Sequence, residues 1–365
     1  MKNKRVLFVA NNSDIVILRF RKEVLQTFAM KGYDVTLVSP ESVEIQVFCD
    51  ANNIKHISVD MSRRGKNPFK DFFLLIKYCK IIKKENPDYI FSYTIKPNIY
   101  VGLVNLFFKK KFYPNITGLG SVFAKKNILT KIVSVLYKVA FKSATKVFFQ
   151  NSSNKAVFVD NKIIGCEKSI MLPGSGVNLT ENKFAEYSKD SGVIKFVFLG
   201  RIMAEKGVYE LLEAFSILEK KHKNIQLDMY GFCEENNEKF LKKVDELKSV
   251  YYHGFTSSSR DVIAESHALI LPSYHEGLSN VLLEAAAMGR PVIATNIPGC
   301  KETFEDGVSG FACEPRDVVS LEKALINFIK LSYDDKISMG KNARIKIQKE
   351  FDRNIVIDKY MQQVS

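Results

Sequence analysis

The chain has 365 residues, of which 46% are hydrophobic, and its formal net charge is +14. At roughly 100–200 residues per domain this length predicts two domains, and the apolar share excludes a disordered chain. The charge is uneven: residues 1–180 carry 29 basic and 12 acidic side chains, a net +17, whereas residues 181–365 carry 25 and 28, a net −3. The two halves are therefore expected to meet different surroundings.

Three further features narrow the class of protein. The apolar run after the basic start ends at Ala10, which is shorter than the core of a secretory signal. The longest charge-free run, 112–124, is shorter than the roughly 20 apolar residues of a spanning helix. The 6 cysteines lie far apart without metal-ligand spacing. We therefore expect no signal, no spanning helix and no zinc site, and cysteines that are reduced in the cytosol.

Strand-like apolar runs alternate with helix-length segments through the first half. Segments 68–85 and 126–142 have apolar residues at helical spacing. This alternation predicts an α/β domain, residues 1–175, with a parallel sheet covered by helices on both faces. The runs lie at 5–10, 34–39, 54–60, 88–94, 111–117, 146–150 and 169–172.

The alternation restarts after a polar stretch, 173–192, that is typical of a linker. Helices are expected near 208–221, 235–249 and 279–288. This predicts a second doubly wound domain, residues 176–350. Because ligands of such sheets bind outside the carboxyl ends of the strands, two facing domains would form a cleft. The strands are expected at 195–199, 225–230, 251–255, 268–271 and 291–295.

The most informative stretch is 271–284. A strand ends in a loop with Glu276 and Gly277, and a helix begins near Ser279, a plausible N-cap whose free N–H groups suit a phosphate. Glu276 and Glu284 are about 12 Å apart along a helix axis, so they cannot grip one atom. They fit a long ligand with hydroxyls at both ends. The alternative is a loop carboxylate and a solvated helix residue, and this motif by itself leaves the two interpretations level.

A second loop, after the strand 195–199, decides between them. Gly200 and Gly207 let the backbone approach a ligand, and Arg201 and Lys206 place two cations at the carboxyl end of the strand. Such cations would neutralise a diphosphate and stabilise the charge that develops as it leaves. Taken without the Glu276 loop, this second loop would be interpreted as a solvated basic segment; the two loops together favour a ligand-binding site.

From Lys195 to Thr295 the chain closely resembles the retaining glycosyltransferases of family 4, which have the GT-B fold of two facing Rossmann-like domains. The resemblance rests on Gly200-Arg201, Glu205-Lys206-Gly207, His253-Gly254 and the Glu276-x7-Glu284 spacing. It implies that Arg201 and Lys206 bind the donor diphosphate, that Glu276 contacts the transferred sugar and that Glu284 binds the ribose. The implied catalytic residues are Glu276, Arg201 and Lys206, and the implied donor-binding residues are Gly200, Arg201, Lys206, His253, Gly254, Glu276, Gly277, Leu278, Ser279, Asn280 and Glu284.

The resemblance also bears on mechanism. Family members need no metal, and the sequence holds no Asp-x-Asp triplet, so no metal and no other cofactor is expected. Retention through front-face attack is implied, with the leaving phosphate helping to deprotonate the acceptor. The final segment, 351–365, is expected to cross back and contact the first domain.

Two stretches of the first half, 93–100 and 115–121, resemble a narrower group. These are bacterial capsule, O-antigen and N-glycan transferases that extend a sugar on undecaprenyl diphosphate, including the N-acetylgalactosaminyltransferases that act on a bacillosamine-linked lipid. Where the wider family has a histidine, this chain has Thr117. The implied acceptor or cleft residues are Lys96, Asn115, Thr117, Gly118 and Gly120.

The basic first half also suits an anionic membrane. Segment 107–113 contains both aromatic and basic residues. Lysines from Lys125 to Lys146 are spaced along a predicted apolar helix, a composition that suits the surface of an anionic membrane. The alternative is a core-facing apolar side with solvated lysines. Nucleic acid is not expected, because no binding signature accompanies the charge.

The sequence therefore predicts an enzyme that moves a hexose or N-acetylhexosamine from a UDP-sugar to a lipid-linked glycan. It is expected to be cytoplasmic and peripheral at the inner face of the plasma membrane. The alternatives are a nucleotide-sugar hydrolase or epimerase of the same fold, and a non-catalytic protein that binds the membrane surface.

Overall fold

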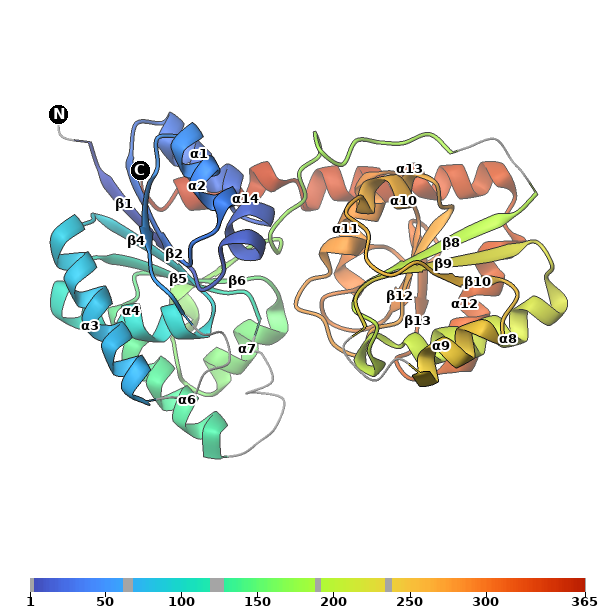
Figure 1. Ribbon diagram of the computed structural model, residues 1–365, viewed down its shortest axis with the longest axis horizontal. Coiled ribbons are helices and arrows are strands. Elements are labelled where there is room, and N and C mark those ends of the chain that lie inside the picture. The colour runs from blue at the N-terminus through green and yellow to red at the C-terminus, as the bar shows by residue number, and fades with distance from the viewer. Residues whose placement is uncertain (1–2, 62–67, 119–127, 188–191, 234–237, 365) are drawn as a thin grey trace. The chain divides into compact units, whose positions relative to one another are not determined.

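A computed structural model describes residues 3–61, 68–118, 128–187, 192–233 and 238–364 (Figure 1). They form two compact units. Unit 1 comprises Met1–Ser175 and Val356–Ser365, and unit 2 comprises Gly176–Ile355. The chain thus returns to unit 1 at Val356 rather than at Phe351. The interdomain cleft stays a prediction.

Unit 1 is built on a 7-stranded sheet in the order β3-β2-β1-β4-β5-β6-β7, with every neighbouring pair parallel. Its strands are β1 (Arg5–Val9), β2 (Asp34–Ser39), β3 (Lys55–Ser58), β4 (Tyr89–Tyr93), β5 (Lys111–Ile116), β6 (Val147–Phe149) and β7 (Ser169–Met171). Its helices are α1 (Lys22–Met30), α2 (Val43–Ala51), α3 (Pro68–Glu85), α4 (Ile95–Phe108), α6 (Ile128–Ala140), α7 (Ser152–Asp160) and α14 (Arg353–Met361), which reaches unit 1 from Val356 onward.

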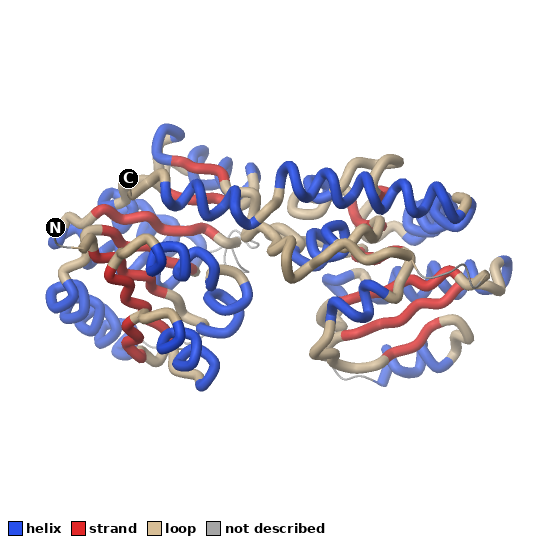
Figure 2. The backbone as a smooth tube through the Cα atoms, turned by 90° about the horizontal axis from the view of Figure 1, so that it is seen from above, coloured by secondary structure: helices blue, strands red, loops and turns tan. Residues whose placement is uncertain are grey.

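Helices cover both faces of this sheet, as strand β1 illustrates. Its side chains alternate, so Val6 and Phe8 join one core, with residues of α1, α2 and α14. Leu7 and Val9 point the other way, into a core formed with α3, α4, α6 and α7. A strand buried on both faces needs a continuous apolar run, and this is the pattern that the sequence shows there. Figure 2 shows the strands layered between the helices.

The folded protein is expected to lose stability in alkali because several of its tyrosines are buried. Burial raises the pKa of Tyr78, Tyr137 and Tyr360 above the ordinary value of 10.0, so each phenol keeps its proton in the folded chain after the unfolded chain has lost it. The free energy of unfolding is therefore unaffected below the ordinary pKa and falls above it, by about 1.4 kcal/mol per pH unit for each tyrosine. Urea unfolding between about pH 9 and pH 11 measures this slope.

The matched variants for that measurement are Tyr78→Phe and Tyr251→Phe. Tyr78 is 1% exposed, and its hydroxyl donates only to the weak acceptor Sδ of Met61. Its replacement should lower the slope by one tyrosine's share. Tyr251 is 48% exposed, so its replacement should leave the slope as it is. Equal slopes in both variants would contradict the assignment of the effect to buried phenols.

Unit 2 is built on a 6-stranded parallel sheet in the order β10-β9-β8-β11-β12-β13. Its strands are β8 (Ile194–Leu199), β9 (Ile225–Tyr230), β10 (Val250–Tyr252), β11 (Ala268–Leu271), β12 (Val292–Thr295) and β13 (Gly310–Cys313). Its helices are α8 (Val208–Lys221), α9 (Glu238–Asp245), α10 (Ser259–Ala264), α11 (Asn280–Ala287), α12 (Val318–Lys330) and α13 (Tyr333–Glu350). Figure 1 shows α8, α9 and α12 on one face, and α10, α11 and α13 on the other.

The direction in which strands are added reverses between β8 and β11. From β8 the chain adds β9 and β10 on one side, and from β11 it adds β12 and β13 on the other. Doubly wound sheets bind their ligands outside the carboxyl ends of the strands at this point, because the connections part there. The loops after β8 and β11 are therefore the expected ligand-binding loops of unit 2.

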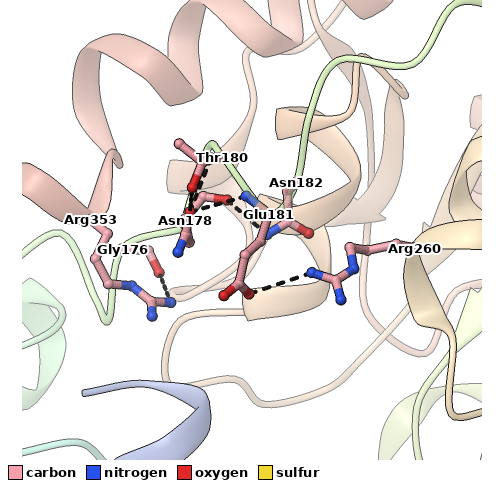
Figure 3. A network of polar contacts seen from close by, with 7 residues as sticks. All are labelled: Gly176, Asn178, Thr180, Glu181, Asn182, Arg260 and Arg353. Atoms are coloured by element: carbon pink, nitrogen blue, oxygen red, sulfur yellow. Dashed lines mark hydrogen bonds and ion pairs between the residues drawn. The ribbon is translucent and has the colours of Figure 1, made fainter. Parts of the chain in front are cut away.

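From Gly176 onward, the described residues of the stretch predicted as a linker belong to unit 2 (Figure 3). Asn178 Oδ1 accepts hydrogen bonds from the backbone N–H groups of Thr180 and Glu181, which form a tight turn. Arg353 donates to the carbonyl of Gly176 at 3.0 Å. Glu181 in turn pairs with Arg260 at 3.4 Å.

Candidate active site

The loop after β8 is shaped by two glycines that a larger residue could not replace. Gly207 has φ +69°, and a Cβ there would lie 2.1 Å from the carbonyl oxygen of Pro272. Gly231, which follows β9, has φ +150°, and its Cβ would lie 1.6 Å from the carbonyl oxygen of Gly200. Both positions therefore require glycine, and the loops after β8, β9 and β11 contact one another through their backbones.

Between Gly200 and Gly207 the loop presents its two predicted cations. Arg201 is exposed directly after Gly200, and Lys206 ends a short helical turn, Ala204–Lys206. Gly207 in its left-handed conformation then opens α8. Since strand β8 ends at Leu199, both cations lie at its carboxyl edge, as the sequence predicts.

The loop after β11 carries Glu276 and is held in place by contacts with the residues at and after the end of β12. Thr295, at the end of β12, donates to the carbonyl of Ser273 at 2.6 Å. Gly299 has φ +90°, and a Cβ there would lie 2.7 Å from the carbonyl oxygens of Glu276 and Gly277. The loop is thus held against two neighbouring segments, and Glu276 has a fixed position.

The two loops meet through side chains. Lys206 Nζ lies 2.5 Å from Glu276 Oε1, and the Ser273 hydroxyl donates to the same oxygen at 2.9 Å. The Lys206 and Glu276 side chains are only 18% and 13% exposed. Because both hydrogen bonds that the carboxylate accepts from described residues go to Oε1, Oε2 is left as an acceptor for a ligand hydroxyl. The structure thus joins the predicted diphosphate cation to the predicted sugar carboxylate.

A further layer supports the Glu276 loop. The backbone N–H of Tyr274 donates to the carbonyl of Glu205 at 2.9 Å, and its hydroxyl donates to Glu210 at 2.5 Å. Burial and this bond raise the pKa of Tyr274 to about 12, so the hydroxyl stays a donor. Burial, and then the charge of Glu276, raise the pKa of the Cys300 thiol, which keeps it neutral beside that carboxylate.

The helix after Glu276 begins where the sequence predicts. Ser279 is the N-cap residue of α11, but its side chain makes no capping hydrogen bond. Its backbone N–H donates instead to the carbonyl of Gly299 at 2.8 Å. Leu278 is buried, whereas Asn280 and Glu284 are half-buried. The predicted N-cap is thus right in position, but its side chain does not cap the N–H groups of the first turn.

His253 and Gly254 follow β10 on the far side of the loop after β9. The ring of His253 pairs with Asp228 at 2.7 Å and stacks on Tyr230 with centroids 4.6 Å apart. Gly254 has φ +70° and accepts the backbone N–H of Gly231 at 2.8 Å. The predicted pair therefore orders the carboxyl edge of β9 and β10.

The sequence analysis overlooked an aromatic pair at this edge. Phe232 and Phe255 are 62% and 61% exposed, and their rings stack with centroids 4.5 Å apart and an interplanar angle of 15°. Each follows a loop glycine, Gly231 and Gly254, directly in the sequence. In the sequence, each of these two residues could have been found as an aromatic residue that directly follows a glycine at the end of a predicted strand.

The residues predicted on the acceptor side behave differently from one another. Lys96 pairs with Asp71 at 2.7 Å near the start of α4. Asn115 is 2% exposed, and its amide bonds the carbonyls of Ser92 and Tyr113 and accepts the Tyr360 hydroxyl. The structure therefore gives Asn115 a supporting place inside unit 1, so it does not face a ligand.

Thr117 and Gly118 are the predicted acceptor residues that remain open. Both are half-buried and follow the end of β5 directly, so they lie at the carboxyl edge of the unit 1 sheet. A Cβ on Gly118 would meet no described residue within 4 Å. Gly120 lies outside the described residues.

A doubly wound parallel sheet in each unit, with a cation–carboxylate pair at the switch point of the second, is typical of the glycosyltransferases of the GT-B class. Solved structures agree on the fold. A glycosyltransferase from Rickettsia africae aligns with a TM-score of 0.78 and 20% identity over 99% of this chain and 98% of that chain. Anabaena Alr3699/HepE in complex with UDP and glucose aligns with a TM-score of 0.80 and 14% identity over 99% of both chains.

Two family descriptions match the sequence in turn. Residues 5–151 match the family Glycosyl transferase 4-like, and residues 180–346 match Glycosyl transferases group 1. The protein is a glycosyltransferase of these group 1 and 4-like families, as its resemblance to family 4 implies.

Curated relatives match over nearly the full length. The N,N'-diacetylbacillosaminyl-diphospho-undecaprenol alpha-1,3-N-acetylgalactosaminyltransferase of Campylobacter jejuni is 26% identical over 94% of this chain and 94% of the relative. The capsular polysaccharide biosynthesis glycosyltransferase CapM of Staphylococcus aureus is 26% identical over 98% and 95%. The UDP-Gal:alpha-D-GlcNAc-diphosphoundecaprenol alpha-1,3-galactosyltransferase of Escherichia coli is 25% identical over 92% and 90%.

Proposed function

We propose that this protein transfers a hexose or N-acetylhexosamine, with retention of configuration, from a UDP-sugar to a glycan on undecaprenyl diphosphate. The transfer would take place at the inner face of the plasma membrane, in the assembly of a surface polysaccharide or glycan. Two of the relatives are named for transfer to such lipid-linked sugars, and one of them for UDP-Gal as donor.

The observation that carries the proposal is the ion pair between Lys206 and Glu276. It brings together a cation suited to a diphosphate and a carboxylate suited to sugar hydroxyls, at the switch point between β8 and β11. A nucleotide sugar has these two features at adjacent positions. Lys206 has three N–H donors, so it can hold a phosphate oxygen and Glu276 together.

The surrounding residues supply the rest of a donor site. Arg201 would share the diphosphate with Lys206 and stabilise its charge as it leaves. Backbone N–H groups at the start of α11, other than that of Ser279, which donates to the Gly299 carbonyl, would hold phosphate oxygens. Glu284, further along that helix, would accept the ribose hydroxyls.

The exposed rings of Phe232 and Phe255 suit the uracil end of the donor. A base of any identity has a π-face that stacks on an aromatic side chain. An exposed pair of stacked rings at the carboxyl edge of the sheet offers such a face. This is an addition to the residues that the sequence analysis selected.

The chemistry would need no nucleophile from the protein. As the bond between the anomeric carbon and the diphosphate breaks, Arg201 and Lys206 would stabilise the UDP that leaves. An acceptor hydroxyl would attack from the same face, and its proton would pass to the leaving phosphate. Glu276 would hold the sugar during this exchange. No metal is proposed, because the two cations take the place of the usual divalent ion.

The acceptor would bind to unit 1. Its carboxyl edge offers Thr117 and Gly118, and residues 1–180 carry the net charge of +17 that suits lipid phosphates. Among the described residues, no helix has the length and apolarity needed to cross a bilayer. We therefore propose a peripheral association with the anionic cytoplasmic leaflet.

A donor-release assay tests this function. The purified protein is given a panel of UDP-sugars in EDTA, with and without undecaprenyl-diphosphate-linked sugars, while free UDP is followed. Release that requires one donor and the lipid acceptor supports transfer and names the sugar. Release without any acceptor would favour a hydrolase or epimerase, and silence across the panel would favour a binding protein.

The donor site itself is tested by two alanine variants. Arg201→Ala and Lys206→Ala should each weaken UDP binding by roughly 10- to 100-fold, because each removes a charge-assisted hydrogen bond worth about 1.5–3 kcal/mol. Isothermal titration calorimetry measures the loss. Lys221→Ala, at the exposed end of α8, is the control and should bind UDP as the wild type does. Unchanged affinity in both site variants would remove the proposed diphosphate site.

A further inference from the structure

Helix α3 exposes a row of large apolar side chains. Phe69, Phe72 and Phe73 are 76%, 59% and 62% exposed, and Ile76 is 36% exposed. Four large side chains on neighbouring turns form a contiguous apolar surface, and monomeric proteins seldom leave one unused. These residues lie in the first half of the helix.

The opposite side of α3 is firmly attached to unit 1. Leu74, Tyr78 and Ile82 are buried in the core beneath the helix. Asp71, near its start, pairs with Lys96 of α4 at 2.7 Å. The exposure of the phenylalanines therefore does not come from a poorly seated helix, since the helix already buries a full apolar side of its own.

The second half of the exposed side is basic. Lys77, Lys80, Lys83 and Lys84 are all exposed. At about 100° per residue, these lysines and the four apolar residues fall within a sector of about 140°. One side of α3 is thus apolar along its first turns and cationic along its last turns.

The neighbouring helix α6 repeats this pattern on a smaller scale. Ile132 and Val135 are 51% and 61% exposed, and Lys131 and Lys138 beside them are exposed as well. Both α3 and α6 contact α4 on the same face of the sheet. Each precedes a parallel strand, so each begins near the carboxyl edge at which Thr117 and Gly118 lie (Figure 1).

We infer that this surface of α3 docks the protein on an anionic lipid bilayer. The phenylalanines and Ile76 enter the headgroup region, and the lysines contact lipid phosphates. A bilayer fits both halves of the surface, because it offers apolar depth and negative charge within one helix diameter. A second copy of the chain fits poorly, since in a symmetric contact the partner offers the same surface, whose 140° sector has no acidic side chain among its described residues to pair with the lysines.

The inference deepens the proposed function and rests on it for the identity of the acceptor. A lipid-linked sugar carries its diphosphate at the bilayer surface. Docking through α3 and α6 would hold the carboxyl edge of the unit 1 sheet next to that surface. Docking itself depends only on the exposed residues described above.

Vesicle flotation with the full-length protein tests the surface. The wild type should float with vesicles of phosphatidylcholine and phosphatidylglycerol, less with phosphatidylcholine alone, and less at high salt. Phe69→Ser/Phe72→Ser/Phe73→Ser should weaken binding to the anionic vesicles at least about tenfold, because buried apolar area is lost. Lys77→Gln/Lys80→Gln/Lys83→Gln should weaken it about 100-fold, since each lysine near the surface contributes about a fivefold gain.

The matched control lies on the opposite face of the same sheet. Val43 and Val47 of α2 are 77% and 62% exposed, so Val43→Ser/Val47→Ser removes exposed apolar surface away from α3. This variant should bind vesicles as the wild type does. Equal binding by the phenylalanine variant would overturn the inference, as would an equal loss in the control.

A probe placed on the helix gives a second readout. Cys79 is exposed on α3, and Cys166 is exposed in the segment before β7. With Cys233 replaced by alanine, a polarity-sensitive dye is attached to Cys79 in a Cys166→Ser chain, or to Cys166 in a Cys79→Ser chain. Anionic vesicles should shift the Cys79 emission to the blue and leave the Cys166 emission unchanged. No shift at Cys79, or an equal shift at both, would overturn the inference.

The failure of docking and the failure of the proposed function can be told apart. The phenylalanine variant should keep the UDP affinity of the wild type and its activity on a water-soluble, short-chain acceptor. Vesicle binding without any UDP release would leave the docking surface in place and remove the transferase function. Conversion of a wild-type dimer to monomer by the phenylalanine substitutions, without vesicle binding, would assign the surface to a second copy and overturn the inference.

Discussion

Glu276→Gln is expected to lower kcat for sugar transfer by roughly 10²–10³-fold while UDP affinity changes by less than about threefold. The amide keeps the shape of the side chain but loses the charge that pairs with Lys206 at 2.5 Å and that receives the Ser273 hydroxyl at 2.9 Å. Lys206 remains available to the diphosphate, so nucleotide binding is preserved. Initial rates of UDP release, with calorimetric titration of UDP, separate the two effects.

The control for this variant is Glu284→Gln, which makes the same chemical change in α11, the helix that follows the Glu276 loop. Glu284 is half-buried in α11, and in the proposed site it meets the ribose. Its replacement should therefore raise KM for the donor and weaken UDP binding, with a smaller effect on kcat. A Glu276→Gln enzyme with near wild-type kcat would refute the role of this carboxylate.

Gly207→Ala is expected to destabilise unit 2 by at least about 3 kcal/mol and to abolish UDP binding. Part of the cost comes from φ +69°, which alanine adopts at a penalty of about 1 kcal/mol. The larger part comes from the carbonyl oxygen of Pro272, 2.1 Å from the new Cβ. To relieve that overlap, the loop after β8 must move away from the loop after β11. Lys206 and Glu276 would then separate.

The matched control is Gly307→Ala. Gly307 has φ +74°, but a Cβ there would meet nothing within 4 Å. This variant should show only the conformational penalty of about 1 kcal/mol and bind UDP normally. Thermal unfolding and UDP titration of the two variants side by side measure the difference. Equal destabilisation would mean that the contact with Pro272 contributes nothing.

Several elements could be predicted from the sequence because their signal is local. The predicted strands 34–39, 225–230 and 268–271 and the helix 68–85 have the bounds that the structure gives them. Strand β13 was not predicted. Its four residues begin with Gly310, where a Cβ would lie 2.3 Å from the carbonyl oxygen of Val292 in β12. This segment becomes a strand because it pairs with β12, and the local sequence does not show that pairing.

Side-chain partners could not be predicted in the same way. Asn115 was selected because it lies in a stretch that resembles the narrower group of transferases, but Tyr360 of α14, 245 residues further along the chain, donates a hydrogen bond to its side chain. The apolar residues of α3 were predicted to form a helix, but the side of that helix that faces the core was not predicted. Helical periodicity alone does not identify that side when apolar residues occur around the helix. The structure buries Leu74 and Tyr78 and exposes Phe72 and Phe73.

The sequence by itself determined the two α/β domains, because strand periodicity is a local property of the chain, and its motifs carried the resemblance to the family and selected the residues of the candidate site. Only the tertiary structure decided that the ammonium group of Lys206 contacts a carboxylate oxygen of Glu276, 70 residues further along the chain. It also decided that Phe232 stacks on Phe255. Such contacts depend on how parallel strands are ordered in the sheet, and that order is fixed by packing between elements distant in sequence.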